Sequence, residues 1–197
     1  MHASDTDTFH VIGLAGSLRR DSFNRRLLEA AAELAPPGLS VLIHPIGRLP
    51  LYDADVEAAG LPPAVARLKT AIAGADGLVI VTPEYNAGIP GVLKNAIDWV
   101  SRPAFASPFV ELPVALVAAS PGRRGGRRAL GHLREVLAST LAETMTEEVS
   151  VAEVHLRLRD AEISDPALER EIRHLLDRLH ERLLERSGRR PAAAQAG

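Results

Sequence analysis

The sequence predicts an α/β fold, in which helices cover both faces of a five-stranded parallel sheet. Five short apolar segments alternate along the chain with segments whose apolar residues recur at helical spacing. Two of the short segments, at residues 77–82 and 113–119, are almost continuously apolar. Continuous apolarity is typical of strands that are buried on both faces, as in a parallel sheet. Right-handed crossovers leave few ways to connect such elements.

Each strand is predicted by a short run of aliphatic and β-branched residues. Strands are expected, in order, at residues 9–15, 40–44, 77–82, 113–119 and 147–154. The first run ends at Gly16, and the third contains Leu78-Val79-Ile80-Val81. These runs are too short to be helices of ordinary length, so we interpret them as strands.

The helices are predicted by apolar residues that recur every three or four positions. They are expected at residues 23–34, 63–75, 90–100, 127–141 and 165–185. Pro36-Pro37-Gly38 ends the first helix, and Pro63 begins the second. The last segment is amphipathic, with its leucines on one face. Residues 48–61 contain Pro50 and Gly60 and are predicted to form a loop.

Length and composition indicate one folded domain with short tails. The chain has 197 residues, of which 46% are hydrophobic and 24% are charged, as in ordinary globular domains. We expect the domain to span residues 9–186. The polar residues 1–8 and the Ala-, Gly- and Arg-rich residues 187–197 are expected to be disordered.

Charge and cysteine content exclude several classes of function. The net charge of −2 gives no general attraction to nucleic acid or to an anionic membrane. The absence of cysteine excludes disulfides, thiolate metal sites and cysteine nucleophiles. The seven histidines show no metal-ligand spacing, so no metal site is expected. The sequence shows neither a signal pattern nor an apolar run long enough to span a bilayer, and we expect a cytoplasmic protein.

The first candidate loop follows the first strand. It runs from Gly16 to Asn24 and leads into a helix, whose N-terminus favours an anion. Its possible donors are Ser17, Arg19, Ser22 and Asn24. We interpret the loop as a phosphate site, with the alternative that Ser22 is only an N-cap and Ser17 only a turn residue.

The loop also narrows the type of phosphate. No Gly-Lys-Ser/Thr follows it, so it is not a nucleoside-triphosphate loop. Gly13-x-x-Gly16 departs from the dinucleotide spacing G-x-G-x-x-G. A terminal monophosphate therefore fits the sequence better than a pyrophosphate.

Two further loops follow the third and fourth strands. Residues 82–91 contain Tyr85, two prolines and two glycines, which favour an irregular backbone that can present N–H groups to a planar ligand. Residues 119–127 contain three glycines and allow close approach of a ligand. Taken singly, each could be an ordinary connection. All but two of the 23 basic residues are arginines, so the pair Arg123-Arg124 carries little weight by itself.

Together these loops resemble the NADPH-dependent FMN reductase family, whose flavodoxin-like members include quinone and chromate reductases. The matching stretches are Gly16-Ser17-Leu18-Arg19-x-x-Ser22-x-Asn24, Thr82-Pro83-Glu84-Tyr85-Asn86, Gly88-x-Pro90-Gly91 to Trp99, and Ser120-x-Gly122. The resemblance covers about residues 9–180. It implies a flavodoxin-like, doubly wound sheet with strand order 2-1-3-4-5.

The resemblance also implies a cofactor and its contacts. FMN would be held at its phosphate by the four donor residues of the first loop. Pro83, Glu84, Tyr85 and Asn86 would line one edge of the flavin ring with backbone donors, and Ser120 and Gly122 would touch the other edge. NADPH or NADH would supply hydride, and a small molecule such as a quinone would accept it. No catalytic acid or base is required.

Other functions remain as alternatives. A flavin-binding electron carrier or regulator would lack NAD(P)H oxidation, although carrier flavodoxins tend to be markedly acidic, unlike this chain with its net charge of −2. Nucleic-acid binding would rely on the arginines at residues 123–128, which are few.

The resemblance implies a homodimer or homotetramer. The apolar residues of the helix at 90–100 predict that this helix forms a dimer contact. Gly131 stands where quinone-reducing relatives commonly carry a tyrosine, which puts a tetramer in question.

Overall fold

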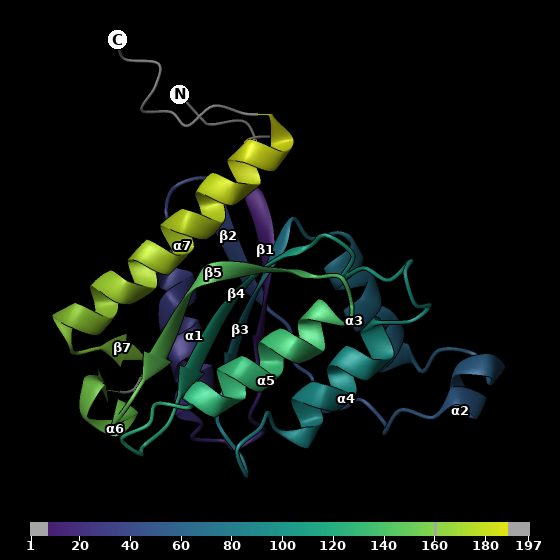
Figure 1. Cartoon of the computed structure of the whole chain (residues 1–197), viewed down its shortest axis with the longest axis horizontal. Helices are drawn as coiled ribbons and strands as arrows, with labels where there is room; N and C mark the ends of the chain where they lie inside the picture. The colour runs from purple at the N-terminus through teal and green to yellow at the C-terminus, as the bar shows by residue number, and fades with distance from the viewer. Residues whose placement is uncertain (1–7, 160, 189–197) are drawn as a thin grey trace.

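The five predicted strands form one parallel sheet in the order β2-β1-β3-β4-β5 (Figure 1). The computed structural model describes residues 8–159 and 161–188. The strands are β1 (Phe9–Ala15), β2 (Leu39–Ile43), β3 (Gly77–Thr82), β4 (Pro113–Ala119) and β5 (Glu143–Val151). Every neighbouring pair is parallel. The predicted fold class and strand order are confirmed.

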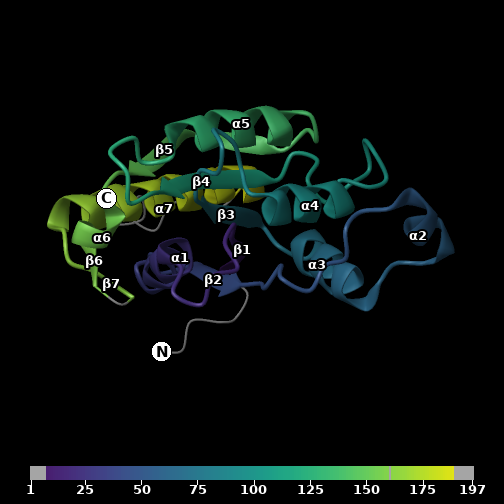
Figure 2. The same ribbon diagram turned by 90° about the horizontal axis from the view of Figure 1, so that it is seen from below.

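Helices cover both faces of this sheet, as Figure 2 shows from below. The longer helices are α1 (Phe23–Glu33), α3 (Pro63–Ala73), α4 (Gly91–Val100), α5 (Arg127–Ala138) and α7 (Pro166–Ser187). One buried cluster joins α1 and α7 to the sheet, and a second joins α3, α4 and α5 to its other face. Within β3, Val79 belongs to the first cluster and Ile80 to the second. This two-sided burial is why β3 is continuously apolar.

The fifth strand begins four residues earlier than predicted and ends three residues earlier. It contains Glu143, Glu147 and Glu148, which are unusual in a buried strand. Each of these glutamates forms an ion pair with an arginine on α5 or α7. β5 lies at the edge of the sheet, so its charged side chains can reach these helices. Because a prediction from hydrophobic runs passes over charged residues, it missed the start of this strand.

Short elements were also missed. The predicted loop at 48–61 contains α2 (Ala54–Ala59), which Asp53 caps and which buries none of its residues. After β5, the chain forms α6 (Val154–Arg157) and a small hairpin of β6 (Leu158–Arg159) and β7 (Glu162–Ile163). Helix α5 ends at Ala138, three residues before its predicted end.

The predicted tails fall almost entirely outside the described residues. Residues 1–7 and 189–197 are not described. Thr8 immediately precedes β1, and Ser187 is the last residue of α7. Helix α7 therefore extends one residue past the predicted end of the domain. Within the described ranges, no helix is long and apolar enough to cross a membrane.

Helix α4 is buried within the chain itself. The side chains of Ala96, Ile97, Trp99 and Val100 are at most 1% exposed. Trp99 also donates its indole N–H to the carbonyl of Pro50 at 2.8 Å. These apolar residues form part of the core, so they do not indicate a dimer contact. A dimer that uses this helix stays a prediction.

Candidate functional site

The three candidate loops meet at the carboxyl edge of the sheet. They follow β1, β3 and β4, which are adjacent strands. The N–H of Gly16 donates to the carbonyl of Val81 at 2.8 Å, which ties the first loop to β3. Asn24 Nδ2 donates to the carbonyl of Ala119 at 3.3 Å, which ties the first loop to the end of β4. Loops that are distant in sequence therefore form one site, as expected for this class of sheet.

The first loop presents donors at the N-terminus of α1. Ser22 caps the helix, its Oγ accepting from the N–H of Arg25 at 3.4 Å. Ser17 Oγ accepts from the N–H of Arg19 at 3.4 Å. Both serines are buried, and neither hydroxyl donates to an acceptor among the described residues. A hydroxyl that accepts one bond keeps its own hydrogen to donate, so the capping role and the phosphate role are compatible.

Backbone groups add to this arrangement. The N–H groups of Phe23 and Asn24, in the first turn of α1, have no partner within the described part of the chain. Such free N–H groups, together with the helix dipole, favour an anion. The loop thus offers hydroxyl and backbone donors at one point, as a phosphate requires.

Asn24 differs from the other donors. Its side chain is 5% exposed, its Nδ2 is already engaged with Ala119, and its Oδ1 is buried without a hydrogen-bond partner in the described structure. Turning the amide over would place Oδ1 against the Ala119 carbonyl, so the observed orientation is favoured. Oδ1 can only accept a hydrogen bond. Oδ1 therefore fits a donor such as a ligand hydroxyl. The predicted contact of Asn24 with the phosphate stays a prediction, because its second Nδ2 hydrogen and its backbone N–H can still donate.

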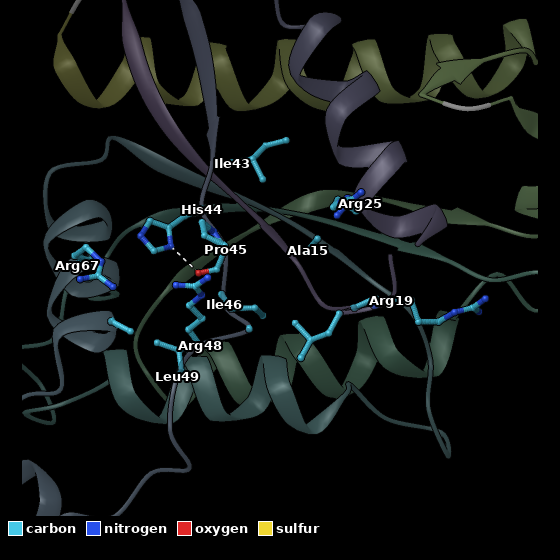
Figure 3. A pocket seen from close by; sticks show the side chains of 14 residues that line it. Ala15, Arg19, Arg25, Ile43, His44, Pro45, Ile46, Arg48, Leu49 and Arg67 are labelled. Atoms are coloured by element: carbon cyan, nitrogen blue, oxygen red, sulfur yellow. Dashed lines mark hydrogen bonds between the residues drawn. The ribbon is translucent and has the colours of Figure 1, made fainter. Parts of the chain in front are cut away.

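Arg19 lies on the exposed part of the first loop. It forms no ion pair among the described residues, and its guanidinium is therefore available to a ligand. A cavity lies on the β2 side of this loop, between the loop and residues 43–49. Figure 3 shows the Arg19 side chain extending away from the centre of that cavity. Arg19 thus remains the predicted charged contact for the phosphate.

The second loop contains a tight turn. Tyr85 and Gly88 exchange two backbone hydrogen bonds, of 2.9 and 3.0 Å. The two residues between them, Asn86 and Ala87, have φ values of 50° and 69°. Positive φ at both central positions is the geometry of a type I′ turn. Tyr85 is 49% exposed, which leaves its ring available to a ligand.

Glu84 fixes this loop to α5. Its Oε2 accepts from the backbone N–H of Arg128 at 3.1 Å, and its Oε1 accepts from Arg128 Nε at 2.9 Å. Gly126, the N-cap residue of α5, has no side chain to cap the helix. Glu84 therefore supplies the cap from another part of the chain, and its side chain supports the loop.

His132 supports the same loop from α5. Its Nδ1 accepts from the N–H of Ile89 at 3.3 Å. A Cβ at Gly88 would lie 2.7 Å from that nitrogen, so only glycine fits there without a shift. Sequence reasoning missed the supporting roles of Arg128 and His132. The available signal was the position of both on the helix that follows the glycine-rich loop.

The third loop is held by its own polar groups. Ser120 Oγ accepts from the N–H of Gly122 at 3.0 Å, and the carbonyl of Gly122 accepts from the backbone N–H of Glu153 at 3.2 Å. A Cβ at Gly122 would meet only Ser120 Oγ, at 3.5 Å, so the space beside this glycine is open. Gly125 and Gly126 instead pack against protein atoms with positive φ. Of these three glycines, only Gly122 borders open space, and its contact with a ligand stays a prediction.

Proteins of known family resemble this chain over most of its length. Residues 9–156 match the family model of NADPH-dependent FMN reductase. An NAD(P)H-dependent FMN reductase of Pseudomonas aeruginosa is 49% identical over 132 residues, which are 67% of this chain and 71% of the relative. A quinone reductase of Escherichia coli is 45% identical over 134 residues, with the same two coverages.

A solved structure shows the same arrangement over nearly the whole chain. The flavoenzyme NAD(P)H:(acceptor) oxidoreductase FerB of Paracoccus denitrificans has a TM-score of 0.82 and 30% identity, covering 90% of this chain and 98% of FerB. The motifs, the fold and the relatives agree: the chain belongs to the NADPH-dependent FMN reductase family, an oxidoreductase family with FMN as cofactor and NAD(P)H as electron donor.

Proposed function

We propose that the protein oxidises NAD(P)H through bound FMN and reduces quinones or similar small acceptors. Relatives at 43–49% identity are named FMN reductase and quinone reductase, which supports both the donor and the acceptor class. The observation that carries the proposal is the set of unused polar groups in the first loop. Two serine hydroxyls, two backbone N–H groups and the unpaired Asn24 Oδ1 fit a phosphorylated polyhydroxyl chain.

The chain's residues would position the cofactor, and FMN itself would supply the hydride chemistry. The donors of the first loop would hold the phosphate, and Asn24 Oδ1 would accept from a ribityl hydroxyl. The N–H groups of Asn86 and Ala87 have no partner in the described structure and can stabilise negative charge at the ring edge. Glu84 would keep this turn in place through Arg128. No side chain is assigned an acid–base role.

The test measures FMN binding by the visible spectrum and then measures NAD(P)H oxidation by the same protein. The purified protein should be yellow or become so with FMN, and it should oxidise NAD(P)H. A protein that binds FMN without oxidising NAD(P)H would favour the electron carrier or regulator instead. A colourless protein that does not bind added FMN would contradict the proposal.

Arg19 tests the phosphate contact. Arg19→Ala should weaken FMN binding about tenfold or more, because it removes a charged partner of the phosphate. Riboflavin lacks the phosphate and should bind the wild type and the variant equally. Arg20→Ala is the matched control and should retain FMN affinity. Equal losses for FMN and riboflavin would contradict the assigned role of Arg19.

We also propose a cytoplasmic homodimer or homotetramer. The basis for assembly is the family likeness together with two large apolar side chains, Leu51 and Phe105, which are 83% and 82% exposed. Gly131 is exposed on α5, and a Cβ added to it would meet no heavy atom within 4 Å. Light scattering at micromolar concentration tests the assembly, and a monomer would contradict it.

A further inference from the structure

A second cationic site lies beside the first loop, on the side of β2. A cavity of about 650 Å³ opens between the first loop, residues 43–49 and the start of α3 (Figure 3). Apolar side chains such as Leu18, Ile46 and Ala64 line it. Its volume lies within the range of small-molecule pockets. Of the four predicted phosphate donors, Ser17 and Arg19 also line this cavity, whereas Ser22 and Asn24 do not. The cavity therefore adjoins the predicted phosphate site and extends beyond it toward β2.

Three of the four arginines that line this cavity, Arg19, Arg48 and Arg67, form no ion pair within the part of the chain that the structure describes. Arg48 and Arg67 come from separate segments and form no ion pair among the described residues, and no acidic residue lines the cavity. Arg25, at the opposite side, pairs with Glu29 at 3.4 Å. Elsewhere, arginines such as those on α7 that face β5 are paired with glutamates. Arg123, Arg124 and Arg127 also line one pocket without an ion pair in the described structure, so unpaired arginines by themselves do not distinguish this cavity. What distinguishes it is the apolar lining beside Arg48 and Arg67.

Arg48 and Arg67 lie on the same side of the cavity as His44 (Figure 3). The ring of His44 is oriented by its Nδ1, which donates to the carbonyl of Pro45 at 3.0 Å. Two guanidinium groups beside an apolar lining suit a ligand with a phosphate at one end and an aromatic ring at the other. Guanidinium groups bind phosphate oxygens in pairs and also stack on aromatic rings.

We propose that this cavity binds a nucleotide, with its phosphate on Arg48 and Arg67 and its base against the apolar lining around Ile46. The adenosine half of the NAD(P)H donor is the source of such a nucleotide in this protein. That assignment of the source rests on the proposed function. The chemistry of the cavity itself does not depend on it.

Calorimetric titration of the FMN-loaded protein with AMP tests the site, with adenosine as the uncharged control. AMP should bind and adenosine should bind at least about tenfold more weakly. Arg48→Ala and Arg67→Ala should each weaken AMP binding about tenfold or more and leave FMN affinity unchanged. Arg170→Ala removes an exposed arginine on α7, away from the cavity, and should bind AMP as the wild type does.

Several results would overturn the proposal. One is absence of AMP binding to the FMN-loaded protein while the FMN-free protein binds it, since AMP would then occupy the FMN phosphate site. Another is unchanged affinity in both cavity variants. If the adenosine half of NADPH occupies this cavity, NADPH should displace AMP, and Arg48→Ala should raise the KM for NADPH without lowering kcat. If either result fails, NADPH is not the nucleotide that the cavity binds. If the protein binds no FMN, the proposed function fails, and titration of the same protein with AMP still decides the cavity.

Discussion

Replacing Glu84 by alanine should destabilise the fold more than replacing its partner Arg128. Glu84 makes two separate interactions: its carboxylate caps the backbone of α5 at 3.1 Å and pairs with the Arg128 side chain at 2.8 Å. The Glu84 side chain is only 12% exposed, whereas that of Arg128 is 56% exposed. Glu84→Ala removes both interactions. Arg128→Ala removes only the ion pair, because the capped N–H belongs to the backbone.

The two interactions differ in size. A helix cap contributes about 1 kcal/mol, and a negative charge at a helix N-terminus adds about 0.3–1 kcal/mol. An ion pair with an exposed arginine contributes about 0.2–1 kcal/mol. Glu84→Ala should therefore lower the free energy of unfolding by about 1.5–3 kcal/mol. Arg128→Ala should lower it by less than about 1 kcal/mol.

Denaturant unfolding of the two variants, each loaded with FMN and free of it, measures the difference. For a domain of this size, each kcal/mol also lowers Tm by about 2–4 °C. Equal losses in the two variants would show that the ion pair, and not the cap, is the stabilising contact. A Glu84→Ala protein as stable as the wild type would refute the role of Glu84 altogether.

Three further contacts, at Gly88, His180 and Asn95, can be tested by unfolding and by amide exchange. Gly88→Ala should cost about 1–3 kcal/mol of stability, because its Cβ would lie 2.7 Å from the His132 ring, and the cost should shrink in a His132→Ala background. Burial lowers the pKa of His180 below its ordinary value of 6.5, so the neutral ring is favoured in the fold. The stability contributed by the neutral ring should be complete above about pH 6.5 and should decline as the pH falls below that value. His180→Leu should make this loss of stability at low pH smaller, as measured by unfolding curves at several pH values. Asn95→Ala removes two hydrogen bonds of 2.8 Å that hold residues 50–52. Amide hydrogen exchange of residues 50–52, measured by mass spectrometry, should therefore become faster. Unchanged exchange would show that Asn95 does not hold this segment.

The pattern of burial made most of the sheet predictable from sequence. β3 has the predicted bounds because its apolar run is uninterrupted. β1 also has the predicted bounds, although the exposed His10 lies within its apolar run. β4 was also predicted residue by residue. The start of β5 was not predictable in this way, since its glutamates depend on arginines on α5 and α7 that are distant in sequence. A hydrophobic pattern records burial, and it does not record ion pairs between elements.

The candidate site was predictable in part. The first loop was recognised because hydroxyl residues between a buried strand and a helix N-terminus are typical of anion sites, and its two serines are indeed buried at the N-terminus of α1. The orientation of Asn24 could not be predicted from sequence, because it depends on the carbonyl of Ala119, 95 residues away. The same holds for Glu84, whose partner is 44 residues away. Side-chain roles that depend on such contacts require the structure.

Helix α2 is set apart from the body of the molecule in Figure 2 and buries none of its residues. The chain just before it is anchored, because Tyr52 packs edge-to-face on Trp99 at 5.0 Å and donates its N–H to Asn95. Unfolding of α2 would therefore stop at this anchor and leave both buried clusters intact. A protease should cut here before it cuts elsewhere in the described structure, and the cut protein should keep its fold. For the same reason, residues 54–60 are a position where a tag or an inserted peptide should be tolerated.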